Sequence, residues 1–185
     1  MRLRGKGLYY LCMLLALAVH GARAHPVDEV VQGAYLTLAP EELRLELDIT
    51  VGSGVAKTML SALDQNADKH VTDLEARAYA RAVLDQSTLI LDGVAAYWVL
   101  HGVTVPPFRS LQIGTDTIKI YAVAKRPDRA GARTLTYQNR YAPSNSVWAA
   151  NVFLQPASGW LYQVTGQQHS EDGQRLTVRY FAARQ

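Results

Sequence analysis

The sequence predicts a mainly β protein, an antiparallel β-sandwich with one inserted helix–loop–helix. Three observations support this fold class. Apolar and polar residues alternate through most of the chain, and clusters of Pro, Gly, Asn and Asp separate the alternating segments at short intervals. Only residues 54–86 show the spacing of helices instead.

The first two predicted strands are residues 33–39 and 43–51. In the second, one face is apolar and the other charged, with Leu43, Leu45, Leu47, Ile49 and Val51 opposite Arg44, Glu46 and Asp48. Only the short link Pro40-Glu41-Glu42 separates the two segments, so we expect a hairpin.

Further strands follow the helical interval. Alternating segments recur to the end of the chain, giving about nine short strands in total with no internal repeat. The later segments are residues 87–93, 95–105, 111–125, 133–142, 146–154, 160–168 and 175–183.

The helical interval predicts two helices, roughly residues 54–63 and 73–86, inserted between the second and third strands. Ser53 is the expected N-cap of the first helix. The apolar residues at helical spacing are Val55, Met59, Leu60 and Leu63, then Leu74, Ala78, Ala82, Val83 and Leu84, with Tyr79 nearby.

Residues 1–24 have the pattern of a secretory signal peptide. A basic start is followed by an apolar run, residues 8–19, and by the small-residue sequence Ala22-Arg23-Ala24. The apolar run is too short to span a bilayer. We therefore expect cleavage after Ala24, a single mature domain at residues 25–185 and a periplasmic or secreted location.

Removal of this segment changes the charge balance. It takes Lys plus Arg from 19 to 15, against 16 Asp plus Glu, so the basic character of the full chain resides in the segment removed. The mature chain then has no basic excess that would indicate nucleic-acid binding. It also has no cysteine and no later segment apolar enough to cross a membrane.

The loop between the predicted helices, DQNADKHVTDLE at residues 64–75, has the oxygen spacing of a calcium site. Six to eight hard oxygen ligands surround calcium, and a 12-residue loop supplies them at positions 1, 3, 5, 7, 9 and 12. These positions are Asp64, Asn66, Asp68, the backbone carbonyl of His70, Thr72 and Glu75. The loop and its helices resemble the EF-hand family, and the resemblance implies one bound Ca²⁺ with these six residues as ligands.

Lys69 departs from the EF-hand pattern. It occupies position 6, where glycine is usual because the backbone adopts a positive φ, at a cost on the order of 1 kcal/mol for another residue. Val71 at position 8 is expected to point into the core. With a lysine beside the ion and no second loop, we expect weak binding, roughly 10⁻⁴–10⁻³ M, and a structural role for calcium.

An alternative interpretation of this loop needs no metal. The acids would then belong to a polar turn between two helices, with Asp73 or Thr72 as a simple N-cap.

A second alternative is a transition-metal site. Cleavage after Ala24 would expose the amine and imidazole of His25, nitrogen ligands suited to nickel or copper, and His101 and His169 are the candidates to complete the site. The His-Pro start, the early strand pair, the acidic insert and Ser146-Val147-Trp148 resemble the extracytoplasmic domain of bacterial nickel/cobalt exporter-like proteins. That resemblance implies a membrane transporter as partner.

The sequence does not favour an enzyme. Gly52-Ser53-Gly54 lacks the G-x-S-x-G spacing of a nucleophile elbow, and we find no H-E-x-x-H motif and no phosphate loop. Aromatic residues lie mostly in predicted strands, where we expect core and cross-strand packing. A groove that binds carbohydrate or peptide is the alternative role for them. They are Tyr97, Trp98, Tyr121, Tyr137, Tyr141, Trp148, Trp160 and Tyr162.

Overall fold

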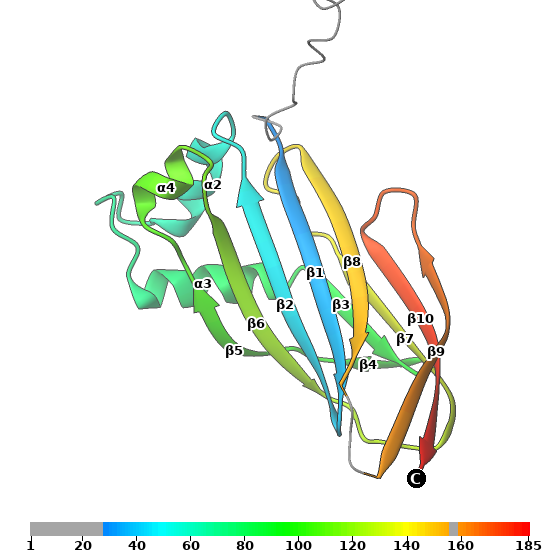
Figure 1. The fold of residues 1–185 in the computed structure, drawn as a ribbon. Coiled ribbons are helices and arrows are strands. Elements are labelled where there is room, and N and C mark those ends of the chain that lie inside the picture. The colour runs from blue at the N-terminus through cyan, green and yellow to red at the C-terminus, as the bar shows by residue number, and fades with distance from the viewer. Residues whose placement is uncertain (1–27, 156–158) are drawn as a thin grey trace, which may run out of the picture.

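A computed structural model describes residues 28–155 and 159–185 and contains two five-stranded sheets (Figure 1). The first sheet has the order β5 (Val99–Thr104), β6 (Thr117–Lys125), β2 (Glu42–Val51), β1 (Val30–Ala39) and β8 (Ser146–Leu154). The second has the order β4 (Val94–Ala96), β3 (Ser87–Leu91), β7 (Gly131–Asn139), β10 (Arg175–Arg184) and β9 (Trp160–His169). The predicted β-sandwich is confirmed. The predicted signal peptide and His25 lie outside the described residues.

The predicted hairpin is confirmed as β1 and β2. The two strands pair antiparallel from Val30 opposite Val51 to Ala39 opposite Glu42, and the turn places Glu41 at a φ of 58°. Every second residue of β2 from Leu43 to Val51 is buried, as the alternation predicts. One pairing departs from the antiparallel arrangement, because β8 runs parallel to β1.

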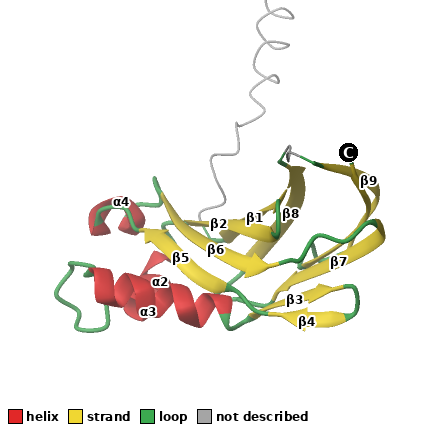
Figure 2. Ribbon diagram, turned by 90° about the horizontal axis from the view of Figure 1, so that it is seen from below, coloured by secondary structure: helices red, strands yellow, loops and turns green. Residues whose placement is uncertain are grey.

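Helices α2 (Ala56–Leu63) and α3 (Asp73–Leu84) form the insert between β2 and β3. They lie at one end of the two layers of strands, and α3 packs against β5 (Figure 2). No helix in the described ranges is long and apolar enough to cross a membrane. These bounds confirm the two predicted helices. Ser53 is not the N-cap of the first, because α2 begins after Val55 and has no side-chain cap.

The apolar face predicted for α3 was partly wrong. Leu74 is 77% exposed, and Ala78 and Ala82 are also exposed. The buried face carries Ala76, Tyr79, Ala80, Val83 and Leu84, so the helix is rotated relative to the predicted stripe. Tyr79 fixes this rotation, since its ring meets Tyr141 edge-on with the centroids 6.0 Å apart.

Two segments predicted as single strands are divided in the structure. Residues 95–105 form the end of β4 and then β5, which belong to different sheets, because the chain passes from one sheet to the other at Tyr97 and Trp98. Tyr97 is 83% exposed, so it has no core role. The segment before β6 forms a short helix, α4 (Phe108–Gln112), where a strand was predicted from Leu111.

Candidate metal-binding loop

The predicted calcium loop connects α2 to α3 and begins with a buried carboxylate. Asp64 is 5% exposed and follows the last residue of α2. Its Oδ1 accepts a hydrogen bond from the backbone N–H of Asp68 (3.2 Å), and its Oδ2 accepts one from the N–H of Lys69 (2.9 Å). The loop therefore wraps around the Asp64 carboxylate.

Asn66 and Asp68 lie side by side in the same half of the loop. The amide Nδ2 of Asn66 donates to Oδ2 of Asp68 (2.9 Å), and the N–H of Asp68 donates to Oδ1 of Asn66 (3.0 Å). Oδ1 of Asp68 also accepts from the N–H of His70 (2.8 Å). Side-chain oxygens from positions 1, 3 and 5 thus gather in one turn of chain, stabilised by local contacts.

Glu75 extends from the first turn of α3 back to the start of the loop. Its Oε1 accepts from the N–H of Gln65 (3.1 Å), and its Oε2 accepts from the N–H (2.9 Å) and hydroxyl (2.7 Å) of Thr72. The N–H of Glu75 donates to Oγ1 of Thr72 (3.3 Å), which completes a capping box. These donors, first of all the Thr72 backbone and hydroxyl, lower the pKa of Glu75.

The backbone of the loop is left-handed at the position where the EF-hand pattern requires it. Lys69 at position 6 has a φ of 66°, as predicted, and Ala67 at position 4 has a φ of 59°. Val71 at position 8 is partly buried and contacts the hydrophobic core, as predicted. The loop therefore has the expected turn at its centre and the expected apolar anchor after it.

The donor set is chemically suited to a hard cation. Asp64, Asn66, Asp68, Thr72 and Glu75 offer oxygens. Each carboxylate oxygen of Asp64 and Asp68 accepts one hydrogen bond and retains a lone pair, whereas Oε2 of Glu75 accepts two from Thr72. Within residues 28–155 and 159–185, however, no three His, Cys, Asp or Glu side chains are already arranged to hold a metal ion. In this conformation the carboxylates bond to backbone N–H groups instead.

The histidines that the structure describes are not brought together. His101 lies on β5 and His169 on β9, and Nε2 of His169 is 2.9 Å from the carbonyl of Ala150 on β8, at the opposite edge of the first sheet from β5. His70 is exposed in the loop. With His25 outside the described residues, none of these contacts supports a shared transition-metal site.

The sequence did not predict a cleft that lies beside the loop. A cleft of about 350 Å³ lies between the loop, α2 and α4, with Asp64, Lys69, Phe108 and Gln112 in its wall. The lysine at position 6 thus lines this cleft. The contribution of Phe108 and Gln112 was missed because no helix was predicted at α4, and its last two residues were assigned to a strand beginning at Leu111.

Comparison of the sequence with models of known protein families gives no match, and comparison with curated proteins gives none. Any assignment of function therefore depends on the residues and geometry of the chain itself.

Proposed function

We propose that the mature chain is an exported calcium-binding protein with one EF-hand-like loop at residues 64–75. The observation that carries the proposal is the position of Glu75. Its carboxylate comes from α3 yet lies against the N–H of Gln65, so the last candidate ligand meets the first part of the loop. The left-handed Lys69 between them supports the same loop geometry.

Charge gives calcium a stabilising role in this loop. Asp64, Asp68 and Glu75 place three carboxylates in one short segment, and Lys69 is the nearest cation in sequence. A divalent ion would offset their mutual repulsion and join the end of α2 to the start of α3. At a calcium concentration tenfold above Kd, linkage contributes about 1.4 kcal/mol to the stability of the folded state.

The competing interpretation, a polar turn without metal, is favoured by the capping box between Thr72 and Glu75. The two interpretations differ in what the Glu75 charge does. A glutamine at this position still completes a capping box, whereas it removes one negative calcium ligand. Glu75→Gln therefore separates calcium binding from helix capping.

The test is calcium calorimetry on residues 25–185, combined with thermal unfolding in calcium and in chelator. We expect one saturable site with a Kd of roughly 10⁻⁴–10⁻³ M and a higher unfolding midpoint in calcium. Glu75→Gln should abolish the heat of binding and the calcium-dependent midpoint. Asp73→Asn is the matched control, because exposed Asp73 lies in the same loop at position 10, is not one of the proposed ligands, and pairs with Arg77 (2.9 Å).

Two outcomes would overturn the proposal. One is no heat and no shift of the midpoint up to several times the expected Kd. The other is equal binding by Glu75→Gln and the wild-type protein, which would leave a capped turn as the better description.

A further inference from the structure

A second cleft, remote from the loop, has one apolar wall and one cationic wall. It encloses about 340 Å³ between the β3–β4 hairpin and the connection from β6 to β7. The hairpin contributes Leu91, Val94, Ala95 and Ala96. The connection and the ends of the strands that it joins contribute Lys125, Arg126, Arg129 and Arg133, which all fall within nine residues of sequence.

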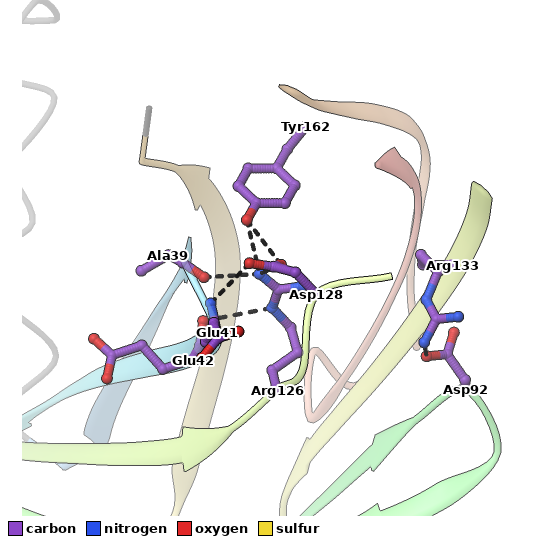
Figure 3. A network of polar contacts seen from close by, with 8 residues as sticks. All are labelled: Ala39, Glu41, Glu42, Asp92, Arg126, Asp128, Arg133 and Tyr162. Atoms are coloured by element: carbon purple, nitrogen blue, oxygen red, sulfur yellow. Dashed lines mark hydrogen bonds and ion pairs between the residues drawn. The ribbon is translucent and has the colours of Figure 1, made fainter. Parts of the chain in front are cut away.

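Arg126 is held rigidly in this wall (Figure 3). The side chain is 4% exposed and pairs through Nη2 with Oδ1 of Asp128 (2.5 Å), whose side chain is 2% exposed. Nη2 also donates to the carbonyl of Ala39 (2.7 Å) and the hydroxyl of Tyr162 (3.2 Å), and that hydroxyl donates to Asp128 (2.8 Å). Nε lies 3.5 Å from the carbonyl of Glu42.

These contacts leave part of the Arg126 guanidinium unused. A guanidinium has five N–H donors in a planar fork, and the contacts to described residues use Nε and Nη2 only. Nη1 takes part in none of them, on a buried side chain that lines the cleft. The surrounding acceptors therefore fix the orientation of the guanidinium while its Nη1 donors stay available.

Arg133 is oriented in the same way by Asp92. The two side chains form an ion pair (Figure 3), and Oδ1 of Asp92 also accepts from the backbone N–H of Thr134 (2.9 Å). Asp92 occupies the β3–β4 turn with a φ of 50°. This pair connects the hairpin wall to the cationic wall.

The charge in the cleft is not balanced. Asp128 and Asp92 offset Arg126 and Arg133, but Lys125 and Arg129 are exposed and form no ion pair with a described residue. Opposite them, Val94 is 69% exposed. A net positive wall facing an uncovered apolar wall is complementary to a molecule with an anionic head and a hydrocarbon portion.

We propose that this cleft binds a small organic anion. A carboxylate or phosphate head contacts Lys125, Arg129 and the free donors of Arg126, and an apolar tail lies on Val94 and its neighbours. The site is independent of calcium, because none of its lining residues belongs to the loop at residues 64–75.

Octanoate is the probe that tests the proposal, with acetate as the head group alone. Calorimetry on residues 25–185 in phosphate-free buffer should show one octanoate site with a Kd of about 1 mM or tighter, and acetate at least about tenfold weaker. The double variant Lys125→Glu/Arg129→Glu should weaken octanoate at least about tenfold. Both residues are exposed, so the fold should survive, and thermal unfolding checks this.

A charge-matched control uses Arg81→Glu/Arg140→Glu, which makes the same change in net charge at exposed positions outside the cleft. This control should bind octanoate as the wild-type protein does. Val94→Ser should weaken octanoate and leave acetate unchanged. The proposal is overturned by absence of octanoate binding, by equal effects of the two double variants, or by equal affinity for acetate and octanoate.

Discussion

The hydroxyl oxygens of Tyr79 and Tyr141 lie 2.8 Å apart in the buried contact that joins the helical insert to the sandwich. Tyr79 belongs to α3, and Tyr141 follows β7. The carbonyl of Tyr141 accepts from Nε2 of Gln32 (2.8 Å) on β1, and Oε1 of Gln32 accepts from Nδ2 of Asn139 (2.8 Å). One connected polar network thus ties α3 to both sheets.

Tyr79→Phe should destabilise the protein. The substitution keeps the edge-on ring contact with Tyr141 but leaves the buried Tyr141 hydroxyl without this partner, at a cost of about 1–2 kcal/mol. Urea unfolding should show a lower midpoint with an unchanged slope, and thermal unfolding a fall of about 2–4 °C per kcal/mol. An unchanged midpoint would mean that the network does not contribute to stability.

Tyr137→Phe should change the stability in the opposite direction from Tyr79→Phe, although both substitutions remove a buried tyrosine hydroxyl. The hydroxyl of Tyr137 is fully buried and has no hydrogen-bond partner among the described residues. Its ring meets Trp98 edge-on at 6.2 Å, a contact that phenylalanine preserves. We expect a stability equal to the wild type or higher by up to about 1 kcal/mol, measured by urea unfolding. A loss of stability would reveal an acceptor for this hydroxyl.

The buried tyrosines should make the protein sensitive to alkali. Burial raises the pKa of Tyr79, Tyr137 and Tyr141 above the ordinary value of 10.0. In the unfolded chain these phenols ionise near pH 10, while in the folded protein they keep their protons. The unfolded state then binds fewer protons, so the contribution of these tyrosines to the free energy of unfolding is constant well below pH 10 and falls as pH rises through and above it.

Urea midpoints measured between pH 8 and pH 11.5 test this dependence. Tyr137→Phe should show a shallower fall above pH 10 than the wild-type protein. Tyr97→Phe serves as the control, because Tyr97 is 83% exposed and should leave the pH profile unchanged. Parallel profiles for all three proteins would contradict the assigned role of burial.

Local patterns predicted the elements whose contacts are local. The β1–β2 hairpin followed from alternation on either side of a short turn, and both helices of the insert followed from apolar spacing. The pairing of Val30 with Ser146 left no such signal, because a parallel contact across more than a hundred residues depends on the whole fold. The rotation of α3 was missed for the same reason, since Tyr79 rather than Leu74 meets the core.

The candidate sites also combine features that local sequence shows with features that only the folded chain shows. The oxygen spacing of the loop was readable, and so was the Thr72-x-x-Glu75 signature of a capping box, which was overlooked. The cations of the second cleft are also concentrated in sequence, between Lys125 and Arg133. Their apolar wall comes from Val94 and its neighbours, and only the folded sheet brings the two segments together.

Lys69 affects the loop in two ways. Its left-handed backbone lowers the stability of the fold, and we expect its positive charge to weaken calcium binding. Its φ of 66° strains a residue with a Cβ by on the order of 1 kcal/mol. Lys69→Gly should relieve that strain, offset in part by the greater freedom of glycine in the unfolded chain. Lys69→Ala keeps the strain and removes only the charge. In chelator, we therefore expect Lys69→Gly to be more stable than Lys69→Ala to urea.

Calcium affinity measures the effect of the Lys69 charge. Both variants remove a positive charge from a loop in which three carboxylates are proposed ligands, so both should bind calcium several-fold more tightly than the wild-type protein at low ionic strength. Added salt should narrow the difference, because it screens exposed charges. If only Lys69→Gly gains affinity, the backbone at position 6 limits binding and the charge does not. If neither gains, the loop at residues 64–75 does not bind calcium through the geometry proposed for it.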